Sequence, residues 1–280
     1  MRLPFLILAL AFGTVSAVSA SEPLNARAAF VERRGLLEAD TQCRLFTPDI
    51  RSALTVGVTQ ARGALLRAGW TSGGVRTLES AAVDAARGRA CNDERTTAAA
   101  ADARRAFASW INVGTMEFPG WERSWRARRA ADASGWRLSQ AVDAPLAATF
   151  GVRQREDEQR LTLVLAAPGN APPAAAQLIL RDRARVSVRE FPLTQRISQG
   201  LAAGLPSPSA AAVVPSIRSL ERIDGRQHAV FTFPDTAFRD LLALDPRESV
   251  EIRLTTGRTV QRIFVEVGDV AAARAFLTIR

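Results

Sequence analysis

The stretch that decides the fold joins the only two cysteines of the chain, residues 43–91, and reads CRLFTPDIRSALTVGVTQARGALLRAGWTSGGVRTLESAAVDAARGRAC. Thr47, Pro48 and Asp49 supply a helix N-cap, a proline at the first helical position and an acid in the first turn. Apolar residues then recur every three or four positions and predict one amphipathic helix: Ile50, Leu54, Val58, Ala61 and Leu65.

A second amphipathic run lies between Val75 and Ala86 and stops at Gly88. If the second helix returns antiparallel to the first, Cys91 comes back to Cys43, which predicts a disulfide-closed helical hairpin. Closing a loop of this length stabilises the fold by about 4 kcal/mol through the entropy of the unfolded chain. The alternative is two buried free thiols, but the N-terminus indicates an oxidising compartment.

Residues 1–20 have the pattern of a secretory signal peptide. Arg2 provides the positive start, residues 3–12 the apolar core, and small residues precede a cleavage site before Ser21. The apolar core is too short for a membrane span, which needs about 20 residues. We therefore expect an extracytoplasmic protein without a transmembrane span in the mature chain, in the periplasm or, as the alternative, secreted.

The residue composition and the absence of known catalytic motifs exclude several classes of enzyme mechanism. The 280 residues carry a net charge of +9, and every one of the 37 basic residues is arginine. The absence of lysine excludes Schiff-base and Ser–Lys mechanisms, and His228 is the only histidine, so it is most simply a hairpin residue. We find no HExxH, CxxC, GxSxG or phosphate-loop motif and expect no metal, no cofactor and no catalytic residue. A signal peptide argues against a nucleic-acid partner.

The pattern along the chain predicts an α+β protein. We expect a helical domain of three to four helices over 21–118 and an aromatic, arginine-rich junction over 119–135. A mostly antiparallel, sandwich-like β domain with two short helices should follow over 136–280. Within it, the Ala/Pro/Ser-rich residues 201–215 are expected to form a mobile loop.

Two candidate surfaces follow from this pattern. Residues 177–191 alternate with period two, which predicts a strand with a ladder of guanidinium groups on one face: Arg181, Arg183, Arg185 and Arg189. The ladder could bind an anionic envelope polymer, or it could be a solvated or edge-protecting face. A second surface would use the indoles of Trp121, Trp125 and Trp136, either to stack sugar rings or to bury the contact between the domains.

Three functional hypotheses remain. The first is a non-catalytic binding or scaffolding protein of the bacterial cell envelope, with an anionic polymer or another envelope protein as partner. The second is a carboxylate-based hydrolase of glycan or peptidoglycan, which needs two converging acids near the tryptophans; candidates are Glu117, Glu122 and Asp132. The third is a module whose helical face, within 24–113, binds a partner through an exposed apolar patch.

Overall fold

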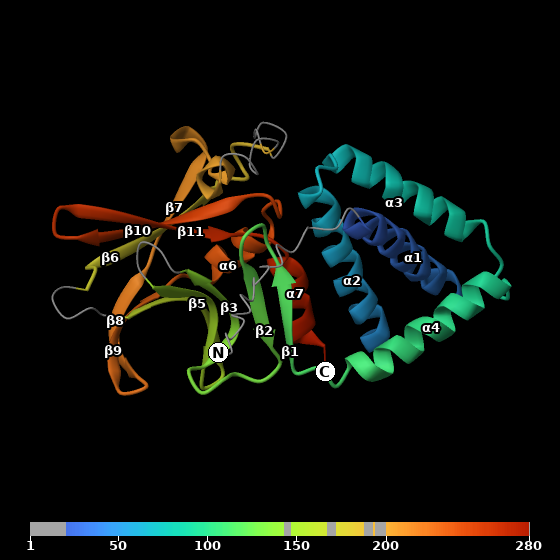
Figure 1. The fold of residues 1–280 in the computed structure, drawn as a ribbon, viewed down its shortest axis with the longest axis horizontal. Coiled ribbons are helices and arrows are strands. Elements are labelled where there is room, and N and C mark those ends of the chain that lie inside the picture. The colour runs from blue at the N-terminus through green and yellow to red at the C-terminus, as the bar shows by residue number, and fades with distance from the viewer. Residues whose placement is uncertain (1–20, 143–146, 167–171, 188–192, 194–199, 280) are drawn as a thin grey trace, which may run out of the picture.

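The computed structural model describes residues 21–142, 147–166, 172–187, 193 and 200–279. The predicted signal peptide and Arg189 lie outside these residues. The four N-terminal helices lie at one end of the molecule, and the β-sheets lie at the other (Figure 1). This confirms the predicted order of helices followed by antiparallel sheets.

Four helices make up the N-terminal layer: α1 (Ser21–Cys43), α2 (Pro48–Arg67), α3 (Ser72–Arg87) and α4 (Glu94–Trp110). The predicted start of α2 is confirmed, because the Thr47 side chain accepts a hydrogen bond from the Ile50 amide and Pro48 is the first helical residue. The disulfide between Cys43 and Cys91 is also confirmed, with the two Cα atoms 5.5 Å apart.

The hairpin differs from the prediction in its packing. Helix α1 is the longest of the four and occupies the centre of the layer (Figure 1). Both α2 and α3 pack on α1 more extensively than on each other. Burial explains the length of α1, because Phe30 packs against Leu65 and Val75 on one side and Leu36 packs against Ile50 on another.

The strands within the described residues form two antiparallel sheets. The seven-stranded sheet contains, in spatial order, β1 (Thr115–Pro119), β2 (Ser124–Arg128), β3 (Trp136–Val142), β4 (Ala148–Arg155), β5 (Glu158–Ala166), β9 (Arg226–Thr232) and β8 (Ile217–Ile223). The four-stranded sheet contains β11 (Thr259–Glu266), β10 (Ser249–Thr256), β6 (Ala175–Arg181) and β7 (Ala211–Pro215). The short helices α6 (Asp235–Leu242) and α7 (Val270–Thr278) complete the fold.

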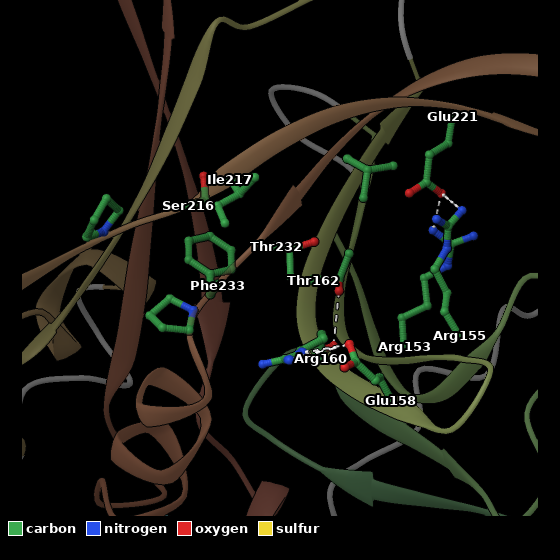
Figure 2. Close-up of a pocket in the computed structure, with 13 residues that line it drawn as sticks. Arg153, Arg155, Glu158, Arg160, Thr162, Ser216, Ile217, Glu221, Thr232 and Phe233 are labelled. Carbon is green, nitrogen blue, oxygen red and sulfur yellow. Dashed lines mark hydrogen bonds and ion pairs between the residues drawn. The ribbon is translucent and has the colours of Figure 1, made fainter.

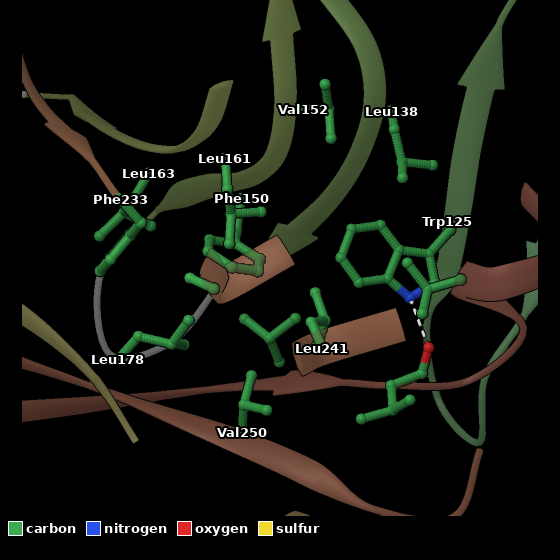
Figure 3. Close-up of a cluster of buried hydrophobic side chains, with 14 of the residues drawn as sticks. Trp125, Leu138, Phe150, Val152, Leu161, Leu163, Leu178, Phe233, Leu241 and Val250 are labelled. Atoms are coloured by element: carbon green, nitrogen blue, oxygen red, sulfur yellow. Dashed lines mark hydrogen bonds between the residues drawn. The ribbon is translucent and has the colours of Figure 1, made fainter. Parts of the chain in front are cut away.

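One core is shared by both sheets. Phe150, Leu161 and Trp125 come from the seven-stranded sheet and meet Leu178 and Val250 of the four-stranded sheet (Figure 3). Helix α7 packs against β1 and β2 of the seven-stranded sheet and against α2 of the helical layer. The helical layer therefore contacts the β core chiefly through α7.

Two predicted segments are corrected. Residues 119–135, expected to be a junction, contribute β2 and its flanking turns to the seven-stranded sheet, and β1 begins already at Thr115. The alternation of Trp125 and Ala127 with arginines buries one face of β2, so this segment is a strand. Residues 201–215, expected to be a mobile loop, contain 3-10 turns at Leu201–Gly204 and Pro208–Ala210 and then β7, which pairs with β6.

Candidate functional site

The outer face of the seven-stranded sheet carries the candidate site. Alternation on β5 sends Leu161 and Leu163 into the core and leaves Thr162 and Val164 on the opposite face. On that face Val164 packs with Trp136 of β3 and Val230 of β9, and Ile223 of β8 packs against the same cluster. Strands β3 and β8 are separated by three strands in the sheet, so this contact requires the sheet to curl with the outer face on its concave side.

An ion-paired carboxylate also spans this concave face. Glu221 of β8 accepts from Arg153 Nη1 at 2.7 Å and lies 2.6 Å from Arg155 Nη2, both through Oε2. The side chains of Arg153 and Glu221 are only 8% and 11% exposed, whereas that of Arg155 is 64% exposed. Arg153 also donates from Nε to the Ser134 carbonyl at 2.6 Å. One buried and one exposed guanidinium thus share a single carboxylate.

These residues line one end of a groove of about 590 Å³ (Figure 2). Arg160 and Glu158 stand at another part of its wall, where Arg160 Nη1 lies 2.6 Å from Asp235 Oδ1 and its Nε lies 3.4 Å from Glu158 Oε2. Apolar groups of Ile217 and Phe233, together with Val230, Pro215 and Pro234, complete the lining. The groove therefore combines three arginines, two glutamates and an apolar wall.

This arrangement favours binding of an anion over hydrolysis. Guanidinium groups donate paired hydrogen bonds to carboxylate, phosphate or sulfate oxygens. A glycosidase needs one carboxyl group that is protonated before the reaction, and both glutamates in this groove accept from arginines. His228 does not line this groove; it lies on β9 with Nδ1 3.0 Å from the Arg226 carbonyl oxygen.

Arg181, Arg183 and Arg185, the members of the predicted arginine ladder that the structure describes, do not form one strand face. Strand β6 ends at Arg181, where the Asp182 carboxylate accepts from the Ala184 amide at 3.0 Å and its carbonyl from the Val186 amide at 3.0 Å, so the chain turns. Arg183 and Arg185 are exposed on this turn, and Arg185 Nε lies 3.0 Å from Asp182 Oδ2.

Arg181 is buried instead of exposed. Its Nε and Nη2 donate to Glu248 at 3.0 Å each, and its Nη1 donates to the Val186 carbonyl at 2.7 Å. Burial raises the pKa of Glu248, and the hydrogen bonds from Arg181 offset part of that rise. A strand pattern cannot distinguish a solvated arginine from one that has a buried acid opposite it.

The three tryptophans do not form a common surface. Trp125 is fully buried and its indole N–H contacts the carbonyl oxygens of Glu266 and Val267 at 3.0 and 2.9 Å. Trp136 belongs to the concave-face cluster. Trp121 lies in the turn after β1, where its amide donates to the buried Glu266 carboxylate at 2.5 Å.

The acids proposed for hydrolysis do not converge in a cleft. Glu117 accepts from Arg126 Nη2 at 2.7 Å across the β1–β2 pair. Asp132 accepts from the amides of Ser134 and Trp136 at 3.0 and 2.9 Å and so holds a turn. The amide of Glu122 donates to Glu266, 3.0 Å away, in the turn between β1 and β2. The hydrolase hypothesis needs two of these acids to converge near the tryptophans, and this arrangement does not provide such a pair.

Sequence reasoning missed the groove. Arg153 and Glu221 are 68 residues apart, and only the curl of the sheet brings them together. The available signal was the outward position of Arg153, Arg155 and Arg160 on two neighbouring amphipathic strands. Comparison with protein-family models, with characterised proteins and with solved structures gives no match to this chain. Among the helices of the described residues, none has the length and apolar character needed to cross a bilayer.

Proposed function

We propose that this protein is a non-catalytic binding protein of the bacterial periplasm whose ligand is an anionic group on an envelope polymer or on another envelope protein. The observation that carries the proposal is that Arg153 and Arg155 share the single carboxylate of Glu221 in a groove that Arg160 also lines. The disulfide and the predicted signal peptide support the extracytoplasmic location.

Arg155 is the residue best placed to take the ligand. Its side chain is 64% exposed, and among the described residues its one ion-pair partner is Glu221, which Arg153 already holds. One carboxylate cannot neutralise two guanidinium groups, so the group of Arg153, Arg155 and Glu221 keeps one uncompensated positive charge, whereas Arg160 has two acids, Glu158 and Asp235, at another part of the groove. An incoming carboxylate, phosphate or sulfate would receive charge-assisted hydrogen bonds from Arg155 against a partly apolar wall.

The test is capture of the protein, produced from the full-length chain, on purified lipopolysaccharide, peptidoglycan and anionic lipid vesicles across a salt series. The groove variant is Arg155→Ser with Arg160→Ser. The matched control is Arg183→Ser with Arg185→Ser, which removes the same charge from exposed positions on the turn after β6. We expect salt-sensitive capture that the groove variant loses and the control keeps.

Three results would contradict the proposal. Equal capture by both variants would mean that net charge, and not the groove, attracts the polymer. If the unaltered protein is captured by none of these anionic surfaces, the proposed anionic ligand is wrong. Turnover of peptidoglycan or glycan in the same samples would favour the hydrolase hypothesis instead.

A further inference from the structure

Three of the four large apolar side chains that are exposed in the described residues lie on two consecutive edge strands, β7 and β8. Large hydrophobic side chains with high exposure in the described residues are Val213, Ile217, Leu220 and Val260, at 52%, 78%, 46% and 55%. The first three lie on β7 and β8, and none of the four belongs to the helical layer. The exposed apolar patch on residues 24–113 that would favour the third hypothesis is thus not among these side chains.

Strands β7 and β8 lie at the edges of two different sheets. Strand β7 is the last strand of the four-stranded sheet and pairs with β6 as far as Pro215. The Ser216 hydroxyl then donates to the Ala176 carbonyl at 2.7 Å, and from Ile217 onward the chain pairs with β9 as the last strand of the seven-stranded sheet. Residues 211–223 thus pass from one sheet edge to another without an intervening loop.

The register of β8 shows which backbone groups face outward. Its hairpin turns at Asp224-Gly225, both with positive φ, and closes at the pair Ile223 and Arg226. A two-residue turn of this kind closes on a hydrogen-bonded pair, and such pairs then alternate along an antiparallel ladder. The amide and carbonyl groups of Arg218, Leu220 and Arg222 consequently point away from β9, toward the free edge.

The same three residues determine the chemistry of a partner. Their side chains lie on one face of β8 and are exposed, and neither arginine has an ion-pair partner among the residues that the structure describes. A second copy of this chain is disfavoured, because two-fold antiparallel pairing about Leu220 would place Arg218 opposite Arg222 of the other copy. The charge and the apolar centre match a strand with an acid on each side of an apolar residue.

We propose that the free edge of β8 binds an extended acidic segment of a partner protein, which adds a strand to the seven-stranded sheet. Outward backbone groups at three residues supply the hydrogen bonds of strand addition, and Arg218 and Arg222 select for acids in the added strand. This inference goes beyond the proposed function, because it involves no groove arginine. Charged edges also protect sheets from aggregation, but protection does not explain the exposure of Ile217 and Leu220 beside the arginines.

The direct test is amide hydrogen exchange of the full chain with the acetylated, amidated peptide Thr-Glu-Thr-Val-Thr-Glu-Thr at millimolar concentration. Exchange at the outward amides of Arg218, Leu220 and Arg222 should slow by about tenfold or more. Exchange at Ser219 and Glu221, whose amides bond to β9, should change little. A peptide with lysine in place of glutamate is the matched control and should give no protection.

A pair of variants separates backbone pairing from side-chain contact. Leu220→Ala removes only the side chain. Leu220→Pro also removes the outward N–H, and it leaves the hydrogen bonds to β9 in place. Peptide protection should weaken several-fold in the alanine variant and disappear in the proline variant. Slow exchange at the Ser219 amide in the proline variant shows that the β8–β9 hairpin is intact. If the proline variant loses this protection, the proposal is judged from the acidic and lysine peptides on the unaltered protein.

Three outcomes would overturn the strand-addition proposal. They are absence of protection at the outward amides with the acidic peptide, equal protection by the lysine peptide, and concentration-dependent dimerisation that itself protects these amides. None of these outcomes tests polymer capture by the groove, which depends on Arg155 and Arg160. The Leu220→Pro variant keeps both arginines. The two proposals therefore fail independently.

Discussion

Arg67 and Asp269 form a two-point ion pair, with Nη1 2.5 Å from Oδ1 and Nη2 2.9 Å from Oδ2, although they are 202 residues apart. Arg67 ends α2 and Asp269 directly precedes α7. The Asp269 side chain makes no capping bond to α7 and reaches α2 instead. Gly63 leaves room for this, because a Cβ at that position would lie 1.8 Å from Asp269 Oδ1.

Loss of this ion pair should weaken the contact between the helical layer and the β core. Arg67→Met leaves the buried Asp269 carboxylate without its partner, and we expect a loss of about 3–5 kcal/mol in the free energy of unfolding. The double variant Arg67→Met with Asp269→Leu should recover most of this loss. Urea unfolding of the three proteins measures both effects. Equal stability of the single variant and the unaltered protein would show that the pair contributes nothing.

Arg181 should behave differently from the arginines that follow it. Arg181→Ser leaves Glu248 buried without its guanidinium and should lower the free energy of unfolding by about 3–5 kcal/mol. Arg183→Ser and Arg185→Ser lie on an exposed turn and should each change it by no more than about 0.5 kcal/mol. Thermal unfolding compares the three variants, and a similar small effect for all of them would restore the predicted surface ladder.

The disulfide should stabilise the protein by about 4 kcal/mol, because it closes a loop between residues 48 apart in sequence. It ties the end of α1 to the connection between α3 and α4. Paired replacement of Cys43 and Cys91 by serine should lower the midpoint of denaturant unfolding by the corresponding amount. Reductant should lower the midpoint of the unaltered protein similarly and leave the serine variant unchanged; a shift of the variant by reductant would contradict this assignment.

Glu251 should contribute stability that depends on pH. Burial raises the pKa of Glu251, but hydrogen bonds from Arg253 at 2.7 Å and Arg262 at 2.8 Å outweigh it, so the net pKa lies below its ordinary value of 4.5. A lowered pKa in the folded state gives stability that is present above the unfolded pKa and is lost as pH falls through the folded pKa. Glu251 also bridges two arginines that face each other across β10 and β11 and so reduces the repulsion between them.

The corresponding variant is Glu251→Gln, whose stability should fall furthest below that of the unaltered protein near neutral pH. The gap should begin to narrow as the pH falls below 4.5, the ordinary pKa of the unfolded chain, and should close only below the lowered pKa of the folded state, where both proteins carry an uncharged group at this position. Denaturant unfolding at a series of pH values measures the gap. A gap that stays constant across the series would mean that the carboxylate charge is not the source of stabilisation.

Signals contained within a few residues were readable from the sequence alone. Thr47 and Pro48 start α2 because capping needs only the next three residues. The disulfide followed from the spacing of two helices around a single pair of cysteines. The order of helices and antiparallel strands followed from the periodicity of apolar residues.

Tertiary structure decided which side chains are buried, which are exposed, and where the site lies. The sequence of β6 gives Arg181 the same outward pattern as a solvated arginine, and only Glu248, 67 residues away, explains its burial. Trp125 became core because the carbonyl groups of residues 266 and 267 accept its N–H. The groove exists because the sheet curls until Glu221 meets Arg153. Each of these depends on partners distant in the chain, and local residue patterns carry no information about which distant strand will lie opposite.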